Sequence, residues 1–279
     1  MKTFPIGVIL DSFRCDLFEA MDRAVAIGAQ GFQVFATAGQ LSPEGITEGY
    51  KQKFIRGIKD RGLTVSALCG DLGHGFTDPQ ANPQLIDRSK RILDLAKELG
   101  TNIVTTHIGT VPEDKTCDTY KVLQEACRDL AEYADAIGSH FAIETGPETA
   151  VCLKEFLDTL DSTGVAVNLD PANLIMCMQD DPVQAVYTLR KYIVHTHAKD
   201  GINMRNIPAW VDKEAAMQAA GKARYLELPL GKGGVDWPNY LKALEEIGYK
   251  GFLTIEREVG DDPSADIHSA ADFLRGLMK

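Results

Sequence analysis

Acidic side chains and histidines recur at the ends of short apolar runs in this sequence, and they are the residues best suited to chemistry. Glu144 follows HFAI, Asp170 follows VAVNL and Glu256 follows GFLTI, while His195 and His197 both lie in YIVHTH. Three carboxylates brought together without a cation would repel one another and raise each other's pKa. A divalent ion removes that penalty, and three carboxylates with one imidazole suit Mn²⁺, Mg²⁺ or Co²⁺.

The apolar runs before these residues have the length and composition of buried strands. Eight such runs are continuously apolar rather than alternating, as expected when helices cover a parallel sheet; they span residues 5–10, 31–36, 64–70, 102–109, 140–145, 165–170, 192–197 and 251–258. Segments with helical spacing lie between them, including 17–28, 86–100, 122–138 and one near 238–247. Eight strand–helix units predict an α/β fold: a single-domain (β/α)₈ TIM barrel over residues 1–279.

A doubly wound open sheet is the alternative fold. It is disfavoured because no G-x-G-x-x-G motif for a dinucleotide follows residues 5–10. In a barrel, side chains at the carboxyl ends of the strands converge on one site. The three carboxylates and one histidine of the seventh strand would therefore meet, with Asp71, His74 and His107 at the ends of neighbouring strands.

The connection after the seventh strand is longer than a barrel requires. Residues 201–237 precede the next helix, and DKEAAMQAAGKA within them could form a short helix. Such an insertion can act as a lid over the active site. The alternative is a surface excursion used in oligomer contacts, and we expect the protein to form a homo-oligomer.

The glycine-rich stretch LPLGKGGVDW (228–237) ends this insertion. It lacks the spacing of a P-loop, so it is either a phosphate cradle of another kind or a tight turn that delivers Trp237 to the barrel rim. The tight turn is the favoured interpretation. Asp200 is expected to anchor the start of the insertion.

The amino-acid composition indicates where the protein is located and which partners it binds. The chain has 29 basic and 40 acidic residues, a formal net charge of −11, which is a poor fit to nucleic acid. Its six cysteines form no C-x-x-C pair, which favours free thiols in the cytoplasm. MKTFPIGVIL lacks a signal-peptide pattern, and its apolar run is too short to span a membrane. We therefore expect a cytoplasmic protein that binds neither nucleic acid nor membranes.

Five segments in matching order resemble the xylose isomerase-like TIM barrels, the sugar phosphate isomerase/epimerase superfamily. They are FAIETGPET, VNLDPAN, VHTHAKD, LPLGKGGVDW and GFLTIERE, and the resemblance covers essentially the whole chain. It implies that Glu144, Asp170, His197 and Glu256 bind one divalent metal ion, with Mn²⁺ preferred over Mg²⁺ or Co²⁺. His195 would then point to the opposite face of the strand as a supporting residue.

The resemblance implies an isomerase or epimerase that acts on a small keto-sugar, a carbohydrate substrate. The ion would polarise a carbonyl and stabilise an enediolate, while Glu144 and Glu256 remove and return the α-proton. Contacts with the substrate are expected from His74, His107, Asn173, Lys199 and Arg205.

The sugar-binding positions depart from the ketose 3-epimerase pattern. Asn173 stands where a histidine is typical, Ala150 where a glutamate is typical with Glu148 nearby, and Asn203 where an arginine is typical with Arg205 nearby. The metal ligands therefore match the pattern and the sugar-binding set does not. A lyase or dehydratase acting on a keto-inositol or a 3-keto-glycoside is the alternative, since it begins with the same proton abstraction. An abasic-site endonuclease and a non-catalytic sugar-binding barrel are remoter alternatives.

Overall fold

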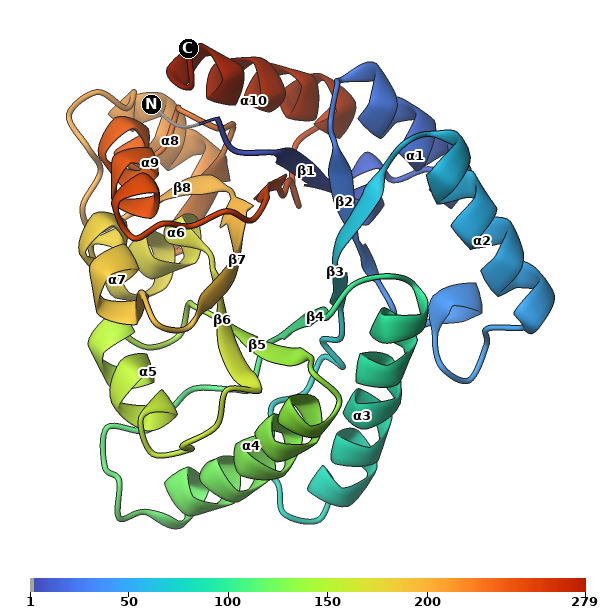
Figure 1. Cartoon of the computed structure of the whole chain (residues 1–279). Coiled ribbons are helices and arrows are strands. Elements are labelled where there is room, and N and C mark those ends of the chain that lie inside the picture. Colours follow the sequence, from blue (N-terminus) through green and yellow to red (C-terminus); the bar gives the residue numbers. More distant parts are fainter. Residues whose placement is uncertain (1–2) are drawn as a thin grey trace.

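The computed structural model describes residues 3–279, which form a closed barrel of eight strands surrounded by helices (Figure 1). All neighbouring barrel strands are parallel. Their order around the ring is β1-β10-β7-β6-β5-β4-β3-β2. The barrel strands are β1 (Ile6–Ile9), β2 (Gly31–Phe35), β3 (Thr64–Cys69), β4 (Ile103–Thr106), β5 (His140–Glu144), β6 (Val165–Leu169), β7 (Ile193–Ala198) and β10 (Leu253–Ile255).

Helices pack around the outside of the barrel, and each predicted strand and helix is present. The main helices are α1 (Leu17–Ala26), α2 (Glu48–Asp60), α3 (Asn82–Glu98), α4 (Asp118–Ala136), α5 (Ala150–Leu157), α7 (Pro182–Leu189), α9 (Trp237–Glu246) and α10 (Pro263–Leu277). Shorter helical segments are Leu10–Phe13, Gly39–Leu41, α6 (Pro171–Asn173) and the π-helix Leu174–Met178. The prediction of a single-domain (β/α)₈ barrel is confirmed.

Local sequence signals explain where several helices begin and end. Asp16, Thr47 and Thr149 precede α1, α2 and α5, and each side chain accepts a hydrogen bond from an otherwise free backbone N–H in the first turn. Gly28 and Gly138 follow α1 and α4 in the left-handed conformation, with φ of 69° and 65°. The positions at which these helices begin and end are thus determined by capping residues that do not face the barrel interior.

The insertion between β7 and α9 is an ordered unit. Strands β8 (Asp200–Asn203) and β9 (Tyr225–Leu228) pair antiparallel, and α8 (Lys213–Ala220) lies between them in sequence. The short helix was predicted and the hairpin was not. The strand sequences DGIN and YLEL lack the continuous apolar runs of the barrel strands, so only their mutual pairing identifies them.

One buried carboxylate joins the two ends of the insertion. Asp200 accepts hydrogen bonds from the backbone N–H groups of Gly231 at 2.9 Å and Val235 at 3.1 Å, and from the indole N–H of Trp237 at 3.0 Å. A Cβ atom added at Gly233 would lie 2.2 Å from Oδ1 of Asp200, so this position requires glycine. The glycine-rich turn therefore surrounds a carboxylate of its own chain and delivers Trp237 to α9. The predicted anchoring role of Asp200 is confirmed.

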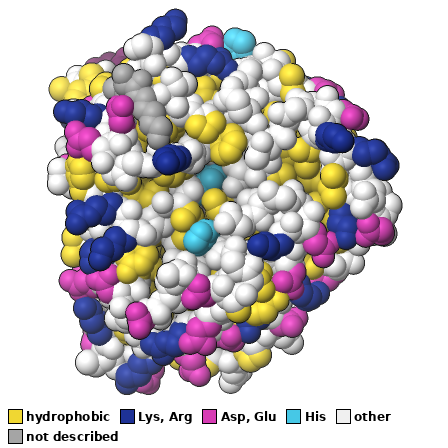
Figure 2. All heavy atoms as spheres, viewed as in Figure 1, with side chains coloured by type: hydrophobic (Ala, Val, Ile, Leu, Met, Phe, Trp, Pro, Cys, Tyr) yellow, Lys and Arg dark blue, Asp and Glu magenta, His cyan; other side chains and the backbone are white. Residues whose placement is uncertain are grey.

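The outer surface carries charges of both signs. On the face shown in Figure 2, Lys and Arg side chains are interspersed with Asp and Glu side chains around the periphery. Within residues 3–279, no helix combines the length and the apolar character that crossing a membrane requires.

Candidate metal centre

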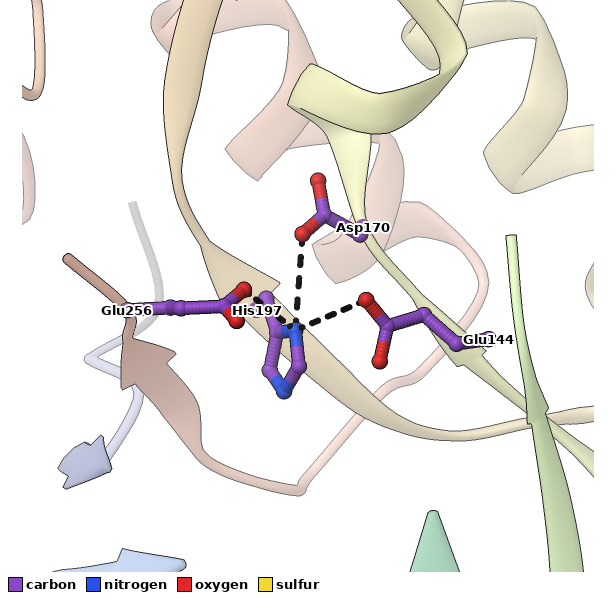
Figure 3. Close-up of side chains that lie close together, drawn as sticks. All are labelled: Glu144, Asp170, His197 and Glu256. Atoms are coloured by element: carbon purple, nitrogen blue, oxygen red, sulfur yellow. Dashed lines mark ion pairs between the residues drawn. The ribbon is translucent and has the colours of Figure 1, made fainter. Parts of the chain in front are cut away.

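Four side chains from four strands converge at the carboxyl end of the barrel (Figure 3). Glu144 ends β5, Asp170 follows β6, His197 lies in β7 and Glu256 follows β10. One ligand atom from each residue lies within 4.8 Å of the others. Glu144, Asp170 and His197 are buried, and the side chain of Glu256 is 11% exposed. The barrel thus brings the predicted ligand set together.

The imidazole of His197 lies between the three carboxylates. Its Nδ1 atom is 2.9 Å from Glu256 Oε2, 3.4 Å from Asp170 Oδ2 and 3.5 Å from Glu144 Oε1. Figure 3 shows these carboxylates approaching the same nitrogen from three sides. Nδ1 is therefore the nitrogen available to a cation held by the group.

Burial and mutual charge set the protonation of the cluster. Burial disfavours the imidazolium form of His197, but Glu256 and Glu144 outweigh burial and raise its pKa well above the usual value. Burial likewise disfavours ionised Glu144, yet His197 and His107 hold the pKa of Glu144 below its usual value. For Glu256 burial dominates and the pKa is raised. The cluster concentrates negative charge that favours a proton or a metal ion among its members.

Two carboxylate oxygens of the cluster are buried without a hydrogen-bond partner among residues 3–279. They are Oδ2 of Asp170 and Oε2 of Glu256, and both face Nδ1 of His197. Buried acceptors of this kind are costly unless a donor or an ion satisfies them. Three carboxylates and one imidazole form the donor set of a hard or borderline divalent ion. The residues therefore fit a divalent metal ion.

Two of the predicted substrate-binding residues lie against the cluster. Asn173 donates a hydrogen bond from Nδ2 to Glu144 Oε1 at 3.0 Å. His107 is partly exposed, with Nε2 3.5 Å from Glu144 Oε1 and Nδ1 2.9 Å from Asp71 Oδ2. The charge of Glu144, together with Asp71, outweighs the burial of His107 and raises its pKa to about 9. His107 thus presents a cationic N–H group beside Glu144.

The other three predicted substrate-binding residues differ in their placement. Lys199 is buried, with its amine 3.4 Å from Glu256 Oε2 and 2.6 Å from Glu258 Oε2. His74 is exposed after β3, and Arg205 is exposed after β8. Within the described chain, no ion pair joins His74 or Arg205 to the four ligand candidates. Their contact with a substrate stays a prediction.

Comparison with known proteins assigns the chain to a family. The sequence profile of the xylose isomerase-like TIM barrel matches residues 21–277, nearly the whole chain. The protein belongs to this family. The resemblance inferred from the five sequence segments is confirmed.

Solved structures of similar proteins share the barrel over its full length. A xylose isomerase domain protein from Planctomyces limnophilus has a TM-score of 0.80 at 28% identity and covers 98% of this chain and 96% of its own. The probable 3-DHS dehydratase AsbF from Bacillus anthracis has a TM-score of 0.77 at 18% identity, covering 98% and 99%. The 3-keto-D-glucoside 4-epimerase YcjR from E. coli has a TM-score of 0.72 at 17% identity, covering 98% and 100%. At their lower identities, the last two comparisons show the shared fold.

One predicted orientation in this xylose isomerase-like barrel is wrong. His195 was expected to face away from the site, but residues two apart on a strand share a face, so His195 and His197 both point into the barrel. His195 lies one layer deeper. Its Nδ1 is 2.8 Å from Asn168 Oδ1, and its Nε2 is 2.9 Å from Thr254 Oγ1 and 3.3 Å from Ser66 Oγ. Its predicted role as a supporting residue agrees with these contacts.

Two buried residues near the ligands were not singled out from the sequence, and a third, Glu148, was noted only as a neighbour of Ala150. Asn168 donates from Nδ2 to Glu144 Oε2 at 3.0 Å, and Gln33 accepts at Oε1 from His197 Nε2 at 3.0 Å. Gln33 interrupts the apolar strand GFQVF and Asn168 interrupts VAVNL. A polar residue within each apolar strand was the available sequence signal. Glu148 accepts from the backbone N–H of Val111 at 3.1 Å, and burial raises its pKa to about 7.

Proposed function

We propose that the protein is an enzyme that uses one divalent metal ion to isomerise or epimerise a small keto-sugar by abstraction of an α-proton. The observation that carries the proposal is the buried set of three carboxylates and one imidazole, with two carboxylate oxygens lacking hydrogen-bond donors. Mn²⁺ is the preferred ion, with Mg²⁺ and Co²⁺ as alternatives. The bound ion would polarise the substrate carbonyl and stabilise the negative charge that develops on its oxygen.

Glu144 and Glu256 are the proposed acid/base pair. They approach the centre from opposite sides in Figure 3, from strands β5 and β10. One carboxylate can therefore take a proton from one face of the substrate while the other returns it to the opposite face. Burial raises the pKa of Glu256, while His197 and His107 hold the pKa of Glu144 below its usual value.

His107 and Asn173 are proposed to bind substrate oxygens beside Glu144. Asp71 holds the ring of His107 through Nδ1, so that Nε2 faces the centre. Lys199, Arg205 and His74 complete the proposed substrate contacts, Lys199 from within the site and the other two from its rim. The insertion 201–237 is proposed to cover the bound sugar as a lid.

Exchange of the α-proton in D₂O tests this function. Ketoses, inososes and 3-keto-glycosides would be incubated with the purified protein and Mn²⁺, and deuterium uptake followed by NMR. We expect exchange with at least one of these compounds, loss of exchange on chelation and its recovery when Mn²⁺ is restored. Absence of exchange throughout, in protein that also binds no divalent ion, would refute the proposal.

A lyase or dehydratase is the second candidate, and Glu148 favours it. Elimination needs an acid that protonates the departing oxygen. Glu148 is buried, its charge interacts with His107 beside Glu144, and burial raises its pKa to about 7, which suits that task near neutral pH. The dehydratase among the structural neighbours supports the same alternative. The NMR samples distinguish the two reactions, since elimination yields an unsaturated product and epimerisation does not.

The partners and the cellular location are also proposed, from the composition, the carboxylate cluster and the cysteines. A small carbohydrate, rather than nucleic acid or a membrane, is the partner that the acidic composition and the carboxylate cluster favour. A cytoplasmic location accords with six unpaired cysteines. A homo-oligomer also remains a proposal, which sedimentation velocity would test.

A further inference from the structure

A hydrogen-bonded polar layer lies inside the barrel beneath the four ligand candidates. Barrel interiors of this kind are usually filled by branched apolar side chains, and a buried polar group is costly unless it is paired. The members of the layer come from six strands and are each at most 5% exposed: Gln33, Ser66, Thr105, Asn168, His195 and Thr254. Packing alone does not account for such a layer at this depth.

Gln33 determines which nitrogen of His197 faces the carboxylates. Oε1 of Gln33 is an acceptor and lies 3.0 Å from Nε2 of His197, so Nε2 must carry the proton. At its other end, the amide of Gln33 donates from Nε2 to Thr105 Oγ1 at 3.0 Å. The lone pair of neutral His197 is then on Nδ1, the atom that lies among Glu144, Asp170 and Glu256.

Without Gln33 a competing hydrogen bond would favour the other tautomer. Nδ2 of Asn168 lies near both ring nitrogens of His197, 3.2 Å from Nε2 and 3.5 Å from Nδ1, so a hydrogen bond to the nearer Nε2 would compete with the contact from Gln33. That bond would leave the proton of a neutral imidazole on Nδ1, where it opposes metal binding. Gln33 therefore acts on the identity of the ligand atom as well as on the position of the ring.

Asn168 orients Glu144 by a similar chain of contacts. The carboxylate of Glu144 only accepts, so the NH₂ group of Asn168 must face Glu144 Oε2, at 3.0 Å. The carbonyl oxygen of Asn168 then faces Nδ1 of His195 at 2.8 Å, which must be its protonated nitrogen. Nε2 of His195 accepts from the hydroxyl of Thr254 at 2.9 Å. His195 thus accepts the amide orientation in which the NH₂ group of Asn168 faces the carboxylate, and its hydrogen bond to Oδ1 stabilises that orientation.

We propose that Gln33 and Asn168 are positioning residues of the metal centre: Gln33 directs Nδ1 of His197 to the ion, and Asn168, aligned by His195, holds Oε2 of Glu144 so that Oε1 is left for the ion. The inference rests on the proposed metal-dependent function. Partners that orient metal ligands typically change metal affinity by about 10–100-fold when they are removed. The proposal therefore concerns metal affinity and ligand geometry, which can be measured without a substrate.

Titration with Mn²⁺ and Co²⁺ tests the inference on the full chain. Gln33→Leu, which keeps the size and removes the hydrogen bonds, is expected to bind both ions about 10–100-fold more weakly and to change the visible absorption spectrum of bound Co²⁺. Gln33→Glu keeps an acceptor oxygen and is expected to retain the wild-type spectrum and most of the affinity. If Gln33→Leu does not fold, Gln33→Asn serves instead, because its shorter amide no longer reaches His197.

Asn168→Leu tests the proposed role of Asn168 and is expected to weaken the binding of both ions to a similar extent. Thr196→Val is the matched control, since Thr196 is equally buried next to His197 but faces Leu169 and Tyr240 outside the barrel. It is expected to lose stability without losing metal affinity or altering the Co²⁺ spectrum. Wild-type affinity and spectrum in both Gln33→Leu and Asn168→Leu would overturn the inference. Failure of the wild-type protein to bind either ion would instead refute the metal-dependent function.

Discussion

Among the ligand candidates, Glu256 has the carboxylate whose negative charge the protein offsets least. Its Oε2 atom has no hydrogen-bond partner among the described residues, and only His197 and Lys199 offset its charge. Burial correspondingly raises its pKa. A carboxylate held in this way is suited both to bind a cation and to accept a proton.

Glu256→Gln is expected to abolish the reaction while preserving the fold, because it keeps the shape of the side chain and removes its charge and basicity. Loss of a general base lowers turnover by about 10²–10⁴-fold. The α-proton exchange rate and the Mn²⁺ affinity measure the effect. Glu258→Gln is the control, since its exposed side chain pairs with Lys199 alone, and a much smaller loss is expected. Undiminished exchange in Glu256→Gln would contradict the proposed acid/base role of Glu256.

Glu148 makes the stability of the protein depend on pH. Its pKa is about 7 in the fold because of burial and near 4.5 in the unfolded chain, so the folded state retains the proton longer as pH rises. The contribution of this group is fully present below the unfolded pKa and is lost as pH rises through the folded value. Glu148→Gln, whose amide oxygen can still accept from Val111, removes this dependence.

The free energy of unfolding of Glu148→Gln should therefore rise relative to wild type between about pH 4.5 and 7. The gain should reach roughly 1–3 kcal/mol and then level off. Urea denaturation at a series of pH values measures it. Exposed Glu155, substituted in the same way, should produce no such trend. If the free energies of unfolding of Glu148→Gln and wild type differed by the same amount at every pH in this range, Glu148 would be ionised throughout.

The insertion is held to the barrel at two points of different character. Asp200 joins its two ends, as described above, and Glu227 of β9 accepts a hydrogen bond from Nη1 of Arg257 at 2.6 Å, beside the ligand candidate Glu256. Arg257 also donates from Nε to Asp266 of α10 at 2.7 Å. The hairpin is therefore tied to the strand that carries a metal ligand.

Asp200→Ala is expected to loosen the insertion before the rest of the barrel. The substitution leaves the N–H groups of Gly231, Val235 and Trp237 without their acceptor, at a cost of about 3 kcal/mol or more. Trypsin should then cleave the insertion faster, and urea should unfold the protein at lower concentration. Asp212→Ala, which removes only the exposed cap of α8, is the control and should cost about 1 kcal/mol. Equal protease resistance in both variants would contradict the anchoring role.

Elements were predictable to the extent that their sequences carry their own periodicity. The barrel strands and the helices α3 and α4 have clear apolar patterns, so their existence and the convergence of Glu144, Asp170, Glu256 and one histidine of β7 could be predicted. The choice of His197 rested on the resemblance to the family. The hairpin β8–β9 could not, because DGIN and YLEL lack a continuous apolar run and are identified by their antiparallel pairing. The orientation of His195 was mispredicted because the alternation of side chains along β7 was applied to residues that share a face.

At the scale of the whole molecule, the metal centre should contribute to stability. Four strands supply the ligands, so an ion that binds only the folded barrel links β5, β6, β7 and β10. Saturation at 100 times the dissociation constant stabilises the fold by about 2.7 kcal/mol. Mn²⁺ is expected to raise the melting temperature of chelator-treated protein, and EDTA should reverse the change. Glu256→Gln should show a smaller rise; an equal rise would place the ion elsewhere.

The contact between Asp200 and Trp237 also bears on how this barrel can be altered. Because a single carboxylate joins the entry and exit of the insertion, the distance between its ends does not depend on what lies between them. Loop-closure entropy changes only slowly with length. We therefore expect that residues 204–224 can be replaced by a segment of another length or sequence while the metal-binding strands keep their positions.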